Sequence, residues 1–107
     1  MKVMFSIKPQ YVERILSGDK IYGFRRRIFK RTDVDTLVIY STLLQGAVVA
    51  EASIEGILES TSLYIWNRTH RQGGIGKDEF MEYFKGSPSA FAIRLGTIRC
   101  FDQHLLS

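Results

Sequence analysis

One segment constrains the fold more than any other: residues 47–58 have the pattern of a single long strand. A typical strand in a globular protein has about five or six residues, and this one is about twice that length. Gly56 lies near its end, where a glycine predicts a bulge or a bend. Long, bent strands are typical of small barrels, because they must curve to close the sheet. The segment therefore favours a small β-barrel.

The rest of the chain alternates β-rich and helical patterns in an order that fits this barrel. Pro9 begins a helical pattern, and Gly18 is placed to cap its end in the left-handed conformation. Turns are expected at Gln45-Gly46 and at Gly96-Thr97. Further strands are expected at residues 2–7, 20–29, 37–41, 90–95 and 98–101, and helices at residues 9–17, 62–71 and 77–84. This order predicts an α+β fold, a small mixed β-barrel of about six strands with two to three flanking helices.

The chain has the size of one domain, residues 1–107. Hydrophobic residues make up 45% of it, which is enough for a core without disulfides. The single cysteine, Cys100, cannot form an internal disulfide, and this is typical of a reducing compartment. No apolar run approaches the length of a membrane span, and the start does not resemble a signal peptide. We therefore expect a cytoplasmic protein without membrane contact.

Positive charge is concentrated in one part of the chain. The net charge is +4, and no acidic residue interrupts residues 20–32. The cations of this stretch are Lys20, Arg25, Arg26, Arg27, Lys30 and Arg31. They are either a solvated strand and turn or a binding site for an anion, and phosphates are a common source of the counter-charge.

Alternation along the predicted strand at residues 20–29 places Gly23, Arg25 and Arg27 on one face. Arginine presents a planar fork of donors that matches a phosphate or a base edge, and Gly23 leaves room for a ligand near the backbone. Lys20 adds a point charge at the mouth of this strand. The structural alternative is that Arg25 pairs with Glu51 or Glu55 on a neighbouring strand.

Gly18, Lys20 and Arg25 carry a resemblance to a known family. Their types and spacing are similar to the ASCH signature Gly-x-Lys-x-x-Glu-x-Arg, with Gly23 in place of the glutamate. The order of the expected elements also fits an ASCH domain. The resemblance covers nearly the whole chain and implies a PUA-like barrel with a cleft beside its helices. Relatives are thought to bind RNA, and some to hydrolyse a modified nucleoside or to cut RNA.

Gly23 bears on whether the chain is an enzyme. The resemblance implies that hydrolytic relatives use the signature lysine with a nearby hydroxyl and a carboxylate. Lys20 matches the lysine, but Gly23 supplies neither of the other groups. Nominal substitutes are Tyr22, Ser41, Thr42, Glu79 and Glu82. We therefore expect binding rather than hydrolysis, with Lys20 as the key residue if the chain is an enzyme.

The helix expected at residues 62–71 offers an extension of the basic surface. Arg68 and Arg71 add positive charge, and Tyr64 lies off the apolar stripe and is a candidate for stacking on a base. Phe24 and Trp66 have the spacing of core residues instead. The glycine-rich stretch at residues 73–76 does not fit a phosphate-binding loop and is expected to be a flexible loop, with a role as a lid possible. Two histidines and one cysteine are too few for a structural zinc site, so we expect no metal and no cofactor.

Three hypotheses follow from these features. The first is a module that binds RNA or a nucleotide, with DNA as a possible ligand, through Lys20, Arg25, Arg26 and Arg27, aided by Arg68 and Arg71. The second is a hydrolase of a modified nucleoside or of single-stranded RNA, with Lys20 as its key residue. The third is a basic module that binds an acidic protein.

Overall fold

The computed structural model describes residues 1–42 and 47–101. Its elements are β1 (Lys2–Ile7), α1 (Pro9–Ser17), β2 (Tyr22–Arg25), β3 (Thr36–Ser41), β4 (Ala47–Ser60), α2 (Ser62–Thr69), the 3-10 turn η1 (His70–Gln72), α3 (Lys77–Phe84) and β5 (Ala90–Cys100). The predicted α+β class is confirmed. The expected turn at Gln45-Gly46 lies outside the described residues. None of the helices in the described ranges is long and apolar enough to cross a bilayer.

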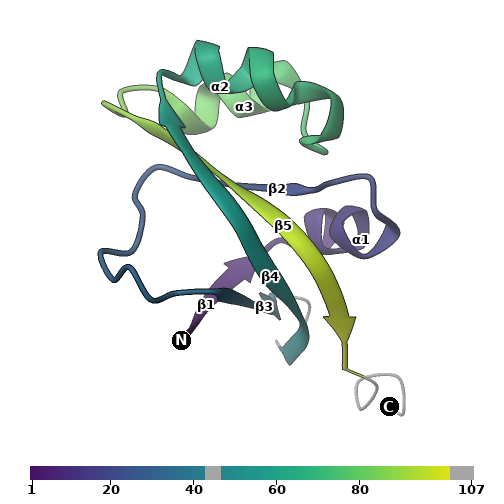
Figure 1. Cartoon of the computed structure of the whole chain (residues 1–107). Helices are drawn as coiled ribbons and strands as arrows, with labels where there is room; N and C mark the ends of the chain where they lie inside the picture. The colour runs from purple at the N-terminus through teal and green to yellow at the C-terminus, as the bar shows by residue number, and fades with distance from the viewer. Residues whose placement is uncertain (43–46, 102–107) are drawn as a thin grey trace.

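The sheet is a curled half-barrel of five strands rather than a closed barrel of six. The strand order is β1-β3-β4-β5-β2, so β1 and β2 form the two edges. The β1–β3 pair is parallel and the other pairs are antiparallel. The long strands β4 and β5 run diagonally through the molecule, with α2 and α3 across one end (Figure 1). The curl brings the two edges toward one another with a space between them.

The prediction of two C-terminal strands is wrong, because β5 continues through Gly96-Thr97 without a turn. Gly96 serves a close approach of two strands instead. A Cβ atom added there would lie 2.4 Å from Ser53 Oγ and 2.7 Å from Glu55 Cγ. The β4–β5 register shifts in this same region, between Ala52 and Gly56. The glycine thus allows the bulged part of β4 to lie close to β5, and close approach of another strand is a common reason for glycine inside a strand.

The second strand is shorter than predicted, because it has a partner only over residues 22–25. Before it, the Ile21 N–H donates to Gln72 O at 2.9 Å. At its other end, Arg25 lies opposite Phe91, next to the start of β5. Arg26 and Arg27 follow as a bend, so Arg27 does not share a strand face with Arg25. The helix expected at residues 62–71 likewise ends at Thr69 and continues as η1.

Two apolar clusters hold the sheet and helices together. One lies between α1 and the strands β3, β4 and β5 and includes the buried Ile15, Leu37 and Ile39. The other lies under α2 and α3 and is centred on Phe80 and Ile65, which have no exposed surface. Phe24 packs against this second cluster, with its ring 5.0 Å from that of Phe80. The edge strand β2 is therefore anchored on one side and open to the space beside β1 on the other.

Candidate functional site

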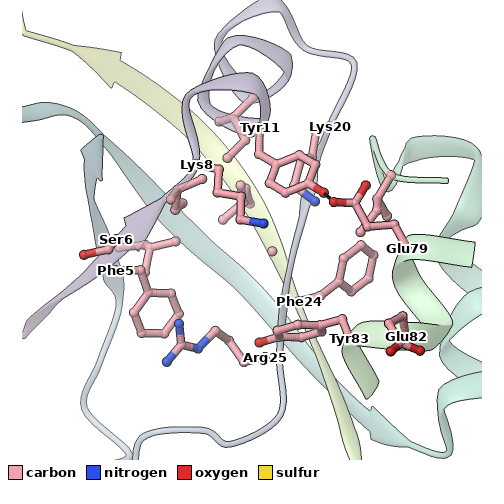
Figure 2. Close-up of a pocket in the computed structure, with 16 residues that line it drawn as sticks. Phe5, Ser6, Lys8, Tyr11, Lys20, Phe24, Arg25, Glu79, Glu82 and Tyr83 are labelled. Carbon is pink, nitrogen blue, oxygen red and sulfur yellow. Dashed lines mark hydrogen bonds between the residues drawn. The ribbon is translucent and has the colours of Figure 1, made fainter. Parts of the chain in front are cut away.

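A cavity of about 470 Å³ lies between the two edge strands, with α1 and α3 at its sides. Figure 2 shows the polar side chains that surround it. Lys8 comes from the residue before α1, Tyr11 from α1, Arg25 from β2, and Glu79, Glu82 and Tyr83 from α3, whereas the hydroxyl of Ser6 on β1 points away. Most of the remaining wall is aliphatic or aromatic. The cavity thus combines an apolar body with a few charged groups, which is typical of a ligand site.

Lys20 is a buried cation in the wall of this cavity. Its residue is 6% exposed, and Nζ donates to Gly73 O at 2.6 Å. The same nitrogen lies 4.5 Å from the centre of the Phe24 ring and 5.4 Å from that of Tyr11. Burial and the nearby Arg14 charge lower the pKa of Lys20 from 10.5 to about 8, and Glu79 raises it in part. Near neutral pH this lysine is therefore charged but able to lose its proton.

Tyr11 and Glu79 form a hydrogen-bonded pair beside Lys20, on the same side of the cavity (Figure 2). The Tyr11 hydroxyl donates to the Glu79 carboxylate, which joins α1 to α3 (Figure 2). Burial and this bond raise the pKa of Tyr11 to about 12. The phenol thus keeps its proton and orients the carboxylate, whose lone pairs can also accept a bond from a ligand.

Arg25 lies at the open side of the cavity, and no carboxylate within residues 1–42 and 47–101 forms an ion pair with it. Its guanidinium carbon is 4.2 Å from the centre of the Phe5 ring, so the cation stacks across the gap between the two edge strands. Its Nε is buried and makes no hydrogen bond to any residue that the structure describes. Glu51, one of its two expected partners, is bound instead by Lys2 at 2.8 Å, and no ion pair within the described ranges joins Arg25 to Glu55. A buried donor without a partner is costly, and a ligand that accepts from Arg25 would remove that cost.

Gly23 is adjacent to Arg25 on the cavity wall, and nothing lies within 4 Å of where its Cβ would be. The residue is therefore not required by packing at this position. Its missing side chain instead leaves open space in the cavity, as the sequence suggested.

A second, basic groove continues from the cavity past Tyr83. It is lined by residues 25–27 and 83, 85–88, including Arg25, Arg26, Arg27 and Lys85. Arg25 and Tyr83 line both the cavity and this groove. The Arg26 guanidinium lies 5.1 Å from the centre of the Tyr83 ring. The cations predicted at residues 25–27 are thus brought together beside the cavity, where they form a continuous path with it.

The other predicted site residues lie elsewhere. Arg68 and Tyr64 are exposed on α2, where the Arg68 guanidinium donates to the Tyr64 hydroxyl at 3.1 Å. These two residues and the exposed Arg71 line neither the cavity nor the groove. Their role in binding stays a prediction. Within residues 1–42 and 47–101, no three His, Cys, Asp or Glu side chains gather where they could hold a metal ion.

Three contributors to the cavity were not recognised as site residues in the sequence: Lys8, Tyr11 and Tyr83. Tyr11 fits the apolar stripe of its helix and is therefore expected in the core. Glu79 was named only as one of several residues that could replace the missing carboxylate. The contact between them spans 68 residues of sequence. The available signal was that Lys8 lies in the connection between β1 and α1, because binding residues are enriched in such connections.

Comparisons with known proteins concern the family and the fold of the chain. A curated protein of Zymomonas mobilis subsp. mobilis, described as an ASCH domain-containing ribonuclease, is 29% identical over 94 residues. The match covers 88% of this chain and 64% of that relative, so the chain spans less than two thirds of the relative's length.

Solved structures match over a larger share of both chains. The crystal structure of ASCH from Zymomonas mobilis superposes with a TM-score of 0.84 at 27% identity, over 92% of this chain and 69% of that one. A mutant protein of the same ZmASCH gives a TM-score of 0.85 at 27% identity, over 92% and 70%. The resemblance to ASCH domains is therefore confirmed. A family model described as "Domain of unknown function (DUF365)" matches residues 1–106, and the chain belongs to this family, with the fold of an ASCH domain.

Proposed function

We propose that this protein binds single-stranded RNA, with one base in the cavity and the adjoining phosphates on the basic groove. The observation that carries the proposal is Arg25, because it lines both spaces and its buried Nε lacks a partner in the described part of the chain. An arginine fork is suited to a phosphate oxygen or a base edge. The name of the curated relative, a ribonuclease, supports RNA as the ligand.

The shape of the site favours a single strand over a duplex. Phe24, Tyr11 and Tyr83 give the cavity aromatic surfaces, and proteins that recognise single-stranded RNA place unstacked bases against such rings. A base held in a duplex would have to be flipped out before it could enter. The groove beside the cavity, with Arg26, Arg27 and Lys85, then provides sites for the flanking phosphates.

The test is a titration of labelled RNA against matched variants. Arg25→Met keeps the stem over Phe5 and removes the donors, while Arg99→Met removes an exposed arginine whose nearest carboxylate is Glu51 at 3.9 Å. We expect Arg25→Met to lose about tenfold or more in affinity and to reduce the salt slope by about one. Arg99→Met should match the wild type.

Ligand form gives a second comparison in the same assay. Double-stranded RNA should compete poorly, and single-stranded DNA of the same sequence measures the contribution of the 2′-hydroxyl. Arg68→Met tests whether α2 extends the site, as the sequence predicted. Equal affinity of a folded Arg25→Met variant and the wild type would refute the proposed site.

RNA cleavage at the same cavity is a second candidate function. It is favoured by a lysine whose pKa is lowered to about 8 and a nearby carboxylate, Glu79, which acts on the charge of that lysine and is bound by Tyr11. In such a reaction the 2′-hydroxyl attacks phosphorus and gives its proton to Glu79. The bond from phosphorus to the 5′-oxygen breaks, and that oxygen takes a proton from the Lys20 ammonium group. The products are a 2′,3′-cyclic phosphate and a 5′-hydroxyl.

This candidate has its own test. Cleavage should end in a cyclic phosphate, and it should stop when the 2′-hydroxyl at the cut site is replaced by hydrogen. Lys20→Met and Glu79→Gln should lose turnover, while Glu59→Gln, which changes an exposed carboxylate on β4, should keep it. RNA that is bound tightly but stays intact in all variants would rule out cleavage and leave binding as the function.

A further inference from the structure

Lys20 depends on the loop between η1 and α3, which we call the glycine loop (residues 73–76). Two cations, Lys20 and Arg14, bind this loop. Lys20 Nζ donates to Gly73 O at 2.6 Å, and an Arg14 guanidinium nitrogen donates to Gly74 O at 2.6 Å. Adjacent carbonyls of one loop are therefore bound by the lysine of the cavity and by an arginine of α1.

Gly74 is fitted to the stem of Lys20. Its φ of +66° is in the left-handed region, where side chains are disfavoured. A Cβ there would also lie 2.7 Å from Lys20 Cβ and 3.0 Å from both Cγ and Cδ. The loop backbone thus packs directly on the aliphatic part of the lysine. Any residue with a side chain would have to move that lysine or the loop.

Gly73 makes a similar close approach to another cavity residue. A Cβ on it would lie 3.1 Å from the Phe24 ring and 3.2 Å from Thr69 O. Gly76, at the end of the same loop, is different, because nothing lies within 4 Å of its Cβ position and its φ is ordinary. The requirement for glycine is therefore specific to the two positions that touch Lys20 and Phe24.

We propose that Arg14 and the glycine pair Gly73-Gly74 are positioning residues, which hold the Lys20 ammonium group at the wall of the cavity. The function of this arrangement rests on the RNA site proposed above. A lysine stem has four rotatable bonds, and a single carbonyl does not fix it. Here the stem is packed under Gly74, and the loop that carries the carbonyl is itself held by Arg14. The loop that the sequence predicted to be flexible is thus bound on two sides.

The charges around Lys20 make this arrangement measurable. Arg14 and the Tyr11–Glu79 pair face it from α1 and α3, and Gly73 O from the loop, while Lys8, Arg25 and Glu82 line the same cavity. Burial and the Arg14 charge lower the pKa of Lys20, whereas Glu79 opposes them. Loss of the Arg14 charge, or movement of Lys20 toward water, should therefore raise the pKa of Lys20.

The experiment follows the Lys20 Cε and Hε resonances through a pH titration by NMR, in the full chain without RNA. Gly74→Ala and Arg14→Gln should raise the pKa of Lys20 from about 8 toward 10.5. Gly76→Ala, a glycine of the same loop, and Arg99→Gln, an exposed arginine elsewhere, should leave it unchanged. Arg14→Lys keeps the charge and should stay closer to the wild type than Arg14→Gln.

RNA affinity is then measured on the same variants. We expect Gly74→Ala and Arg14→Gln to lose about tenfold while their circular dichroism stays native. An unchanged pKa of Lys20 in both folded variants would overturn the inference. If Gly74→Ala does not fold, the comparison of Arg14→Gln with Arg14→Lys decides. Arg14 is exposed, so we expect both variants to fold. If the wild type binds no RNA, the proposed function fails, but the titration still decides whether these residues position Lys20.

Discussion

The buried lysine should make the protein more stable at alkaline pH. Lys20 has a pKa of about 8 in the folded protein and 10.5 as its ordinary value. Below pH 8 it is protonated in both the folded and the unfolded state, so the full cost of burying the charge is present. Between these two pKa values the unfolded chain binds one more proton than the folded protein, and the free energy of unfolding therefore rises with pH.

The size of this effect follows from the shift. One pKa unit corresponds to about 1.4 kcal/mol, so the total is about 3 kcal/mol, of which about 2 kcal/mol appears between about pH 7 and pH 10. Lys20→Met keeps the stem and removes the charge. The variant loses the bond to Gly73 O, which costs about 1 kcal/mol. We thus expect it to be about 2 kcal/mol more stable than the wild type near neutral pH.

Urea unfolding across this pH range checks the prediction. The wild type should gain stability relative to Lys20→Met as the pH rises, until the difference between them reverses or disappears. Other titrating groups are common to both proteins, and the comparison removes their contribution. Lys30→Met, which removes an exposed lysine, is the control and should follow the wild type. Parallel curves for the wild type and Lys20→Met would refute the reasoning.

Three further predictions concern the cavity and the core. Glu79→Gln should lower the pKa of Tyr11 from about 12 toward 10, because the carboxylate bond and charge help to raise it; ultraviolet difference spectroscopy of the tyrosines measures this. Phe80→Ala should cost about 3 to 5 kcal/mol in the free energy of unfolding, because Phe80 has no exposed surface. Gly96→Ala should cost about 1 to 3 kcal/mol by overpacking, whereas Gly56→Ala, with nothing within 4 Å of its Cβ position, should be much milder. Equal costs for the two glycines would contradict the explanation given for the continuous β5.

Local patterns predicted most of the elements, because each depends on neighbouring residues. As expected, α1 begins at Pro9 and is capped at its C-terminus by Gly18, which has a φ of 89°. The prediction was wrong where glycine had a nonlocal reason. At Gly96 the constraint comes from β4, more than 40 residues away in sequence, and nothing in the local sequence separates that case from a turn.

The candidate site was also predicted only in part, because local patterns reveal neighbouring residues and not contacts between distant ones. Lys20 and Arg25 were found because they lie close together in sequence within a run of cations. The pair of Tyr11 and Glu79 was not found, because its contact depends on how α1 and α3 pack on the sheet; Glu79 was named only as one of several substitutes for a missing hydroxyl or carboxylate. The sequence also placed Arg27 with Arg25 by strand alternation, and that argument failed once β2 ended for lack of a partner.

The strand order has a consequence for how the molecule assembles. β2 pairs only with β5, which is the last strand described. The cavity takes one wall from residues 5–25 and another from residues 75–95, so it depends on contacts between distant parts of the chain. Such contacts form late, because a long loop must close before they stabilise the fold. We therefore expect Lys20 to stay solvated until the loop at residues 73–76, which packs on its stem, has been synthesised, and the pairing of β2 to wait for β5.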